Sequence, residues 1–73
     1  MNEKKLDLSP FCIRARAFLA QGRVDDALGL FGDVLKVDPD NAQAYADRGT
    51  TYAMLKKFDP ALNDREKAFA LGP

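Results

Sequence analysis

The chain offers few side chains that could do covalent chemistry. Among 73 residues there is no histidine and one cysteine, Cys12. Histidine-based acid–base or triad catalysis is therefore excluded, and so is a zinc site built from clustered sulfur and imidazole ligands. The sequence also has no glycine-rich phosphate loop and no Gly-x-Ser-x-Gly elbow. We therefore expect a protein that is not an enzyme, that needs no cofactor or metal, and that acts by binding.

The charges argue against two classes of partner. Eleven basic and eleven acidic side chains cancel, so no overall field draws the chain to nucleic acid or to an anionic membrane. Residues 25 to 47 carry six acidic groups and one basic group, whereas the segments on either side are mildly basic. An acidic middle between basic ends could guide self-association, or it could simply be a solvated surface. We expect a protein or peptide partner, with no nucleic acid and no membrane.

Composition and length indicate one small folded domain in the cytoplasm. The chain is 47% hydrophobic and 30% charged, which is typical of globular proteins. Its start, Met1 to Lys5, leads into no long apolar run. The sequence therefore predicts neither a secretory signal nor a transmembrane helix. With a single cysteine, it also predicts no internal disulfide.

Apolar residues recur at spacings of three and four, which predicts helices and no strands. After a polar lead-in at residues 1–7, we expect four helices, at about residues 10–20, 24–37, 42–55 and 59–71. Ser9 and Asp59 each precede a proline and are expected to cap a helix, as is Asn41. Gly22 is expected to end the first helix in a left-handed conformation.

The chain is weakly repeated with a period of 34 residues. A shift by this period aligns identical residues at Arg14/Arg48, Asp25/Asp59, Ala27/Ala61, Leu28/Leu62 and Pro39/Pro73, and similar ones at Phe11/Tyr45, Ala15/Gly49 and Phe18/Tyr52. This pattern resembles the tetratricopeptide repeat, a family of stacked helical hairpins. The expected fold is all-α, with one repeat at residues 8–41 and a second at 42–73.

The matched residues have physical roles in such a fold. The small residues Ala15, Gly49, Ala27 and Ala61 are expected where the two helices of a hairpin approach closely. The aromatic residues of the first helix in each repeat are expected to fill the space between hairpins. The chain departs from the family pattern in having Arg14 and Arg48 where a leucine is usual, and Arg65 where an aromatic is usual.

The resemblance implies a concave surface lined by the first helix of each hairpin, on which family members bind peptides or helices. Six residues are the expected partner-binding set: Cys12, Arg16, Gln43, Asp47, Thr50 and Met54. Each has a plainer alternative. Cys12 could be a small apolar core residue, Arg16 and Asp47 could pair with each other across helices, and Met54 could pack at an edge.

One variant of the family grips the terminal carboxylate of chaperone tails with lysine, asparagine and arginine on these rows. At matching positions this chain has Cys12 for the first lysine, Arg16 for the first asparagine and Asp47 for the second. Since an acid there would repel a carboxylate, we do not expect this chain to bind chaperone tails.

Two repeats are fewer than the roughly three that such arrays normally need. Arg65 stands where a third unit would pack, which favours a true end of the array. Leu62, Phe69 and Leu71 would then remain uncovered on the last helix. We therefore hold two hypotheses: a protein-binding module, and a self-assembling unit that forms a weak homodimer. The homodimer would form by docking through these three residues or by exchange of hairpins, and Pro39 favours docking because it opposes the helix fusion that exchange needs.

Overall fold

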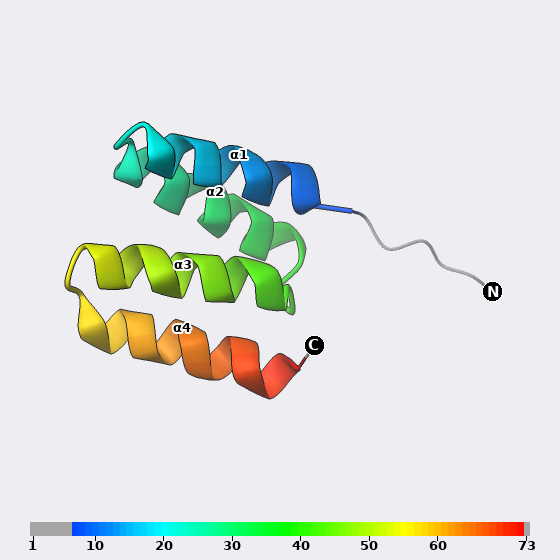
Figure 1. Ribbon diagram of the computed structural model, residues 1–73. Coiled ribbons are helices and arrows are strands. Elements are labelled where there is room, and N and C mark those ends of the chain that lie inside the picture. Colours follow the sequence, from blue (N-terminus) through cyan, green and yellow to red (C-terminus); the bar gives the residue numbers. More distant parts are fainter. Residues whose placement is uncertain (1–6, 73) are drawn as a thin grey trace.

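The computed structural model describes residues 7–72 and contains four α-helices in that range, arranged as two antiparallel hairpins (Figure 1). The helices are α1 (Ser9–Ala20), α2 (Val24–Val37), α3 (Ala42–Met54) and α4 (Phe58–Leu71). Each expected helix is present, with ends within two residues of the prediction. The all-α fold of packed hairpins is therefore confirmed. Most of the predicted lead-in, residues 1–6, lies outside the described residues, as does Pro73.

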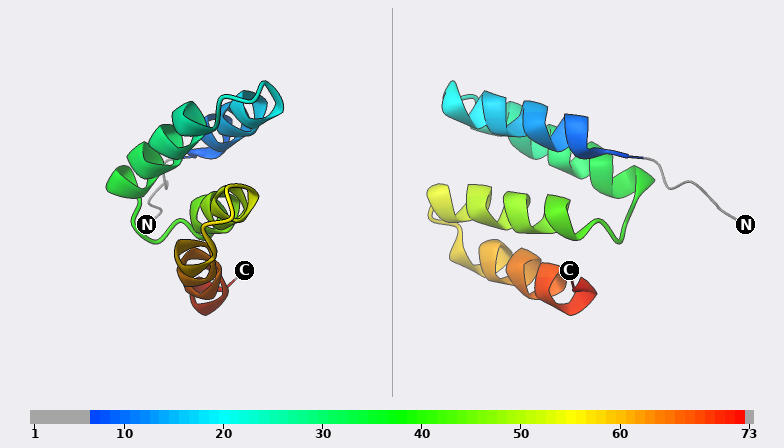
Figure 2. Two further views of the ribbon diagram at one scale, coloured as in Figure 1. Left: turned by 90° about the vertical axis from the view of Figure 1, so that its left-hand side faces the viewer. Right: turned by 45° about the vertical axis from the view of Figure 1, so that its right-hand side comes forward.

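The two hairpins stack side by side (Figure 2). Within a hairpin, α1 packs on α2 and α3 packs on α4, and the hairpins meet chiefly through α2 and α3. The described chain extends over 43, 25 and 17 Å along its principal axes, so it is a flat stack. No helix between residues 7 and 72 is long and apolar enough to cross a bilayer.

The apolar core belongs mainly to the first hairpin. Seven buried residues form one cluster: Leu8, Cys12, Ala15, Ala27, Phe31, Val34 and Ala44. Ala15 and Ala27 are completely inaccessible, as expected where α1 and α2 approach closely. Ala44 is the member contributed by α3, so this cluster also joins the two hairpins.

The second hairpin is closed by small residues and an ion pair. A Cβ atom added at Gly49 would lie 3.1 Å from the carbonyl oxygen of Ala61 and 3.0 Å from Cγ of Arg65. Only glycine therefore allows α3 and α4 to lie this close without a local shift. Beside this contact, Arg48 donates from Nε to Oδ2 of Asp64 at 2.8 Å and from its terminal nitrogen to Oδ1 at 2.9 Å.

This ion pair is largely shielded from water. The Arg48 and Asp64 side chains are 25% and 8% exposed, and the guanidinium lies 5.6 Å and 5.8 Å from the ring centres of Tyr45 and Tyr52. The hydrogen bonds that Arg48 donates to the Asp64 carboxylate raise the pKa of Arg48 further above its already high value. Arg48, which departs from the family pattern, therefore has a structural role. The sequence analysis did not anticipate its partner.

The same turn ends the first helix of both hairpins. Gly22 has φ 78°, as predicted, and Lys56, 34 residues later, has φ 61°. A lysine in this left-handed region is uncommon. The similarity shows that the repeat geometry is kept even where glycine is not.

The predictions for helix caps were partly wrong. Asn41 caps α3 as expected, because its Oδ1 accepts from the backbone N–H of Ala44 at 2.9 Å. Ser9 instead lies within α1, and Asp7 supplies the acceptor, at 3.0 Å from the Ser9 nitrogen. That hydrogen bond lowers the pKa of Asp7. Asp59 also lies within its helix, since α4 begins at Phe58 without a side-chain cap.

Three of the four aromatic residues expected between the hairpins are partly buried, and their position there stays a prediction. Phe18, Tyr45 and Tyr52 are half-buried. Phe11 is 42% exposed, so its expected place between the hairpins was wrong.

Candidate binding surface

A polar network crosses between the two hairpins on the predicted concave rows. Arg16 of α1 donates from Nε to Oδ2 of Asp47 in α3 at 3.2 Å. Gln43 donates from Nε2 to both Asp47 oxygens at 3.1 Å. Arg16 and Asp47 therefore pair across helices, which was one of the two alternatives for them. Because the Arg16 side chain is 52% exposed, the pair stabilises the fold by no more than about 1 kcal/mol.

This network limits the hydrogen bonds that Asp47 can make with a ligand. Its carboxylate already accepts three hydrogen bonds and its side chain is 18% exposed. Arg16 keeps about half of its side chain in water, so it stays accessible. The Arg16–Asp47 pair has no net charge, and the Asp47 carboxylate is held between a cation and an amide.

Cys12 does not lie on this surface. It is 2% exposed and belongs to the apolar core, so its expected partner-facing role was wrong and the core alternative holds. Burial raises the pKa of the thiol, and the nearby Asp47 charge raises it further. Cys12 is therefore a neutral packing residue.

Thr50 and Met54 are both exposed on α3. Thr50 donates from Oγ1 to the Ala46 carbonyl oxygen at 3.1 Å, and Met54 is 55% exposed at the end of the helix. Met54 therefore has little packing around it. Both side chains are open to a partner.

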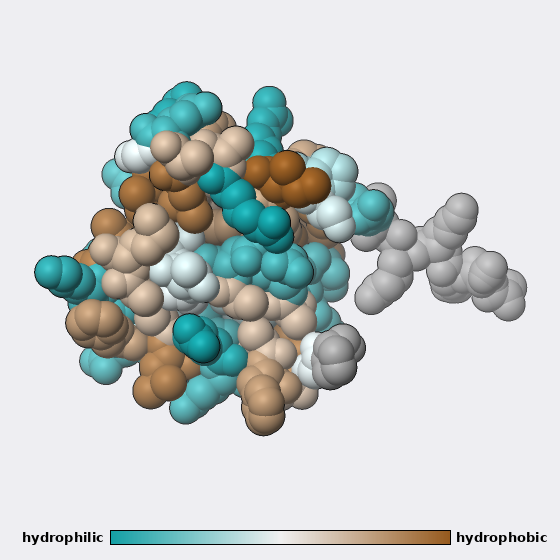
Figure 3. Space-filling view, viewed as in Figure 1, coloured by the Kyte–Doolittle hydropathy of each residue, from teal (hydrophilic) through white to brown (hydrophobic). Residues whose placement is uncertain are grey.

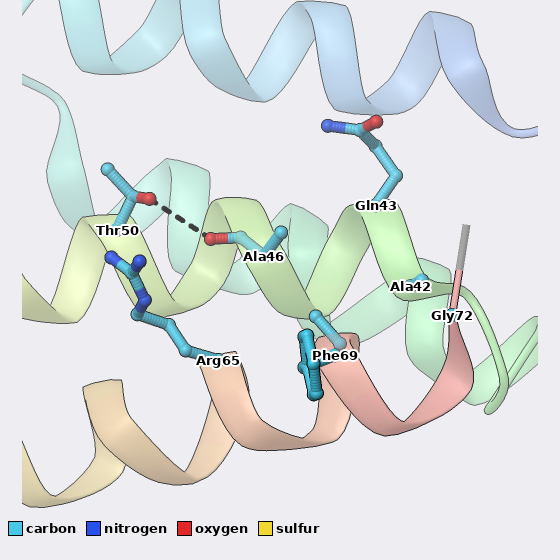
Figure 4. A pocket seen from close by; sticks show the side chains of 8 residues that line it. Ala42, Gln43, Ala46, Thr50, Arg65, Phe69 and Gly72 are labelled. Carbon is cyan, nitrogen blue, oxygen red and sulfur yellow. Dashed lines mark hydrogen bonds between the residues drawn. The ribbon is translucent and has the colours of Figure 1, made fainter.

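A hollow of about 650 Å³ opens between α3 and α4 (Figure 4). Its lining includes Gln43 and Thr50 of the predicted set, and the full lining is Ala42, Gln43, Ala46, Thr50, Arg65, Ala68, Phe69 and Gly72. Figure 4 shows Arg65 extending from α4 toward Thr50, and the ring of Phe69 at the edge. The ion pairs within residues 7–72 are Arg16–Asp47, Arg23–Asp26 and Arg48–Asp64, so Arg65 is in none of them.

The hollow has a counterpart in the first hairpin, which is filled. A shift by 34 residues aligns four of its lining residues with the first hairpin. Ala42, Ala46, Arg65 and Ala68 align, in that order, with Leu8, Cys12, Phe31 and Val34. The four residues of the first hairpin are buried in the core that α3 covers. In the second hairpin the side chains at three of these positions shrink to alanine, and no further helix within residues 7–72 covers them. The hollow is therefore the unoccupied equivalent of the α3 packing site.

Sequence reasoning did not assign Arg65 or Ala68 to a binding surface. The 34-residue alignment carried the signal, because it pairs Arg65 with a buried phenylalanine. What it could not show is that α3 covers the first set and leaves the second open.

The three residues predicted for self-association are all exposed. Leu62 is 57%, Phe69 88% and Leu71 38% accessible to solvent. Figure 3 shows hydrophobic residues interspersed with hydrophilic ones along the edge formed by α4. Leu71 points away from Phe69, because two residues turn a helix by about 200°. The three therefore do not form one patch.

Comparison with known proteins identifies the repeat. A family model described as "Tetratricopeptide repeat" matches residues 18–63. Human "Tetratricopeptide repeat protein 28" is 36% identical over 52 residues, covering 71% of this chain and 2% of that protein. Wheat (Triticum aestivum) "Hsp70-Hsp90 organizing protein" is 32% identical over 60 residues, covering 82% and 10%. Mouse "DnaJ homolog subfamily C member 3" is 38% identical over 69 residues, covering 94% and 12%.

The chain thus spans about an eighth or less of the length of these relatives. The match covers both hairpins in part, and it agrees with the 34-residue period and with the close contacts at Ala27 and Ala61. The chain belongs to the tetratricopeptide repeat family.

Proposed function

We propose that this chain is a non-enzymatic protein-interaction module that binds a peptide or a helix of a partner protein. The observation that carries the proposal is the hollow between α3 and α4, which adjoins the concave row. Arg16, Gln43, Asp47, Thr50 and Met54 remain the proposed contact residues of that row, without Cys12. The cytoplasmic setting expected from the sequence remains part of the proposal.

The kind of ligand that we propose follows from the chemistry of the hollow. Its lining includes three alanines and the ring of Phe69, so it favours a bulky apolar side chain, whose burial is worth about 1.5–3 kcal/mol. Arg65 extends over it without an ion-pair partner among the described residues, so it favours an acidic side chain on the ligand. The proposed ligand segment therefore carries a large apolar residue beside an aspartate or glutamate.

Two of the relatives are named for chaperone partners or as DnaJ homologues, but we do not extend chaperone-tail binding to this chain. Asp47 holds a negative charge on the concave row, and its oxygens are occupied by Arg16 and Gln43. A terminal carboxylate would have to displace Asp47 from these two donors. We propose instead an internal segment that places its acid at Arg65.

The test is peptide selection followed by mapping. Peptides selected for binding from a displayed random library should be enriched in an acidic residue near a large apolar one. Added to isotopically labelled protein, they should shift the amide resonances of residues 42–50 and 65–72. Shifts confined to the outer face of α2, or selected peptides rich in lysine and arginine, would contradict the proposal.

A second candidate function, self-assembly, is favoured by one specific observation. Phe58, Leu62 and Phe69 of α4 are 64%, 57% and 88% exposed. Large apolar side chains this accessible on one helix are typical of an interaction surface.

A further inference from the structure

The stem of the Arg65 side chain lies directly against Gly49. A Cβ atom added at Gly49 would lie 3.0 Å from Cγ of Arg65, whereas carbon atoms in ordinary contact are about 3.5–4.0 Å apart. A methyl group there would therefore force the Arg65 side chain to move. Because Gly49 has no Cβ, the stem can lie close to α3 at this point, and Figure 4 shows the side chain continuing toward Thr50.

No ion pair fixes the direction of this side chain. Arg65 takes part in none of the ion pairs found between residues 7 and 72, and it is exposed. An arginine side chain in this situation can adopt many rotamers. Its direction over the hollow therefore depends on what its stem packs against, and the stem packs against Gly49.

The repeat itself does not require glycine at this position. In the first hairpin the equivalent residue is Ala15, which is completely inaccessible where α1 and α2 approach closely. What also differs is the residue opposite, because Arg65 replaces Phe31. The second hairpin thus changes both members of the pair, which indicates that Gly49 makes room for the Arg65 stem.

We propose that Gly49 is a positioning residue for acid recognition in the hollow: it lets Arg65 hold its guanidinium at the Thr50 end, where it binds a carboxylate of the ligand. This role rests on the proposed function and adds the residue that makes the site distinguish a carboxylate from an amide. A guanidinium held in one place can donate two parallel hydrogen bonds to a carboxylate. An uncharged amide gains less from the same contact. The site should therefore prefer aspartate or glutamate to asparagine or glutamine.

One measurement tests the position of Arg65 without a ligand. In NMR spectra of the parent, nuclear Overhauser effects should connect the side-chain protons of Arg65 with the Thr50 methyl group. They should be lost in Gly49→Ala, because the added methyl group turns the stem away from α3. Their absence in the parent, or their persistence in Gly49→Ala, would overturn the proposal. Since the parent spectrum alone can contradict it, the test does not depend on the folding of a variant.

A second measurement compares two peptides by fluorescence anisotropy. One is selected on the parent from the displayed library, and the other has the acid nearest its large apolar residue replaced by the matching amide. The parent should bind the acidic peptide about tenfold more tightly. Gly49→Ala should reduce this ratio to about twofold or less, chiefly by weakening the acidic peptide. A Cβ at Gly49 would also lie 3.1 Å from the Ala61 carbonyl oxygen, but loosened helix packing would weaken both peptides alike.

Three further variants complete the comparison of peptides. Arg65→Ala should bring the ratio close to one, and Gly49→Ala/Arg65→Ala should give the same ratio, because Gly49 acts through Arg65. Gly29→Ala on α2 is the matched control, since a Cβ added there meets no neighbouring group within 4 Å. It should keep the parent ratio. Circular dichroism melts verify that every variant is folded.

The outcomes separate this inference from the proposed function. A parent that binds both peptides equally would contradict the acid site at Arg65, and the role of Gly49 with it. A parent that prefers the acidic peptide, together with a Gly49→Ala variant that keeps the full preference, would overturn the role of Gly49 alone.

Discussion

In the first hairpin, position 31 holds a phenylalanine that is completely buried, whereas the equivalent position in the second holds Arg65, which is exposed. The contrast extends along both helices. Leu30 packs against the apolar core, but its equivalent, Asp64, is buried in an ion pair with Arg48. The same helical hairpin is thus held together at this position by apolar packing in the first repeat and by a charged pair in the second.

This difference shows which hairpin buries the residues at these positions and which one leaves some of them exposed. The first hairpin buries four residues in the core that α3 covers: Leu8, Cys12, Phe31 and Val34. The second has alanine at three of the equivalent positions and Arg65 at the fourth, where water or a partner can reach it. A repeat can therefore keep its geometry while one copy supplies stability and the other supplies a surface.

The largest expected effect comes from the position where the two hairpins differ most. Phe31→Ala should lower the free energy of unfolding by about 3–5 kcal/mol, because it empties the centre of the core. Arg65→Ala should change it by no more than about 0.5 kcal/mol. Chemical denaturation of the two variants measures both values. Equal losses would mean that the second hairpin packs like the first.

Removal of the Arg48–Asp64 ion pair should have the second-largest effect on the free energy of unfolding. Asp64→Ala leaves Arg48 without its partner and should cost about 2–4 kcal/mol, the lower values applying because Arg48 is a quarter exposed. The double variant Arg48→Leu/Asp64→Leu should recover most of this loss by imitating the apolar chemistry at Leu30.

Arg14, the equivalent of Arg48 in the first hairpin, supplies the matched control for this experiment. It is exposed, so Arg14→Leu should leave the unfolding midpoint in urea almost unchanged. If Asp64→Ala unfolded at the same urea concentration as the parent, the ion pair would have no structural role.

Overpacking should cost both hairpins a smaller and similar amount. Ala27 is completely inaccessible and Ala61 is 4% exposed, so a leucine at either place should force the helices apart and cost roughly 1–3 kcal/mol. Thermal melts of Ala27→Leu and Ala61→Leu test this. Melting temperatures equal to that of the parent in both would contradict the helix contacts described above.

Most of the fold could be predicted from local signals in the sequence. The spacing of apolar residues, Gly22 and Asn41 sufficed for the helices and two of their ends. The caps at Ser9 and Asp59 failed because a proline in the first turn fixes a helix start only to within a residue or two.

The site was less predictable, because it depends on contacts between hairpins. Pairing of Asp47 with Arg16 and burial of Cys12 both follow from how closely α1 lies to α3, which no local pattern encodes. The Arg48–Asp64 pair joins residues 16 apart. An i to i+4 analysis within one helix cannot find it.

The smallest predicted effect concerns pH. The pKa of Cys12 is raised in the folded protein from an ordinary value near 9.0, so the native state holds its proton more tightly than the unfolded chain does. Below pH 9 this group therefore causes no pH dependence, and as the pH rises above 9 stability is lost. Cys12→Ala should show a shallower decline in urea denaturation between roughly pH 8.5 and 10.5. Parallel curves would contradict a buried thiol.

The most direct test of the central claim is to fill the hollow that the second hairpin leaves open. Ala46→Phe places a ring between α3 and α4, while Ala70→Phe adds the same ring at an exposed position of α4 outside the lining. Fluorescence anisotropy with a peptide selected on the parent should show at least about tenfold weaker binding for Ala46→Phe and an unchanged affinity for Ala70→Phe. Equal affinities in two folded variants would show that the hollow is not the binding site.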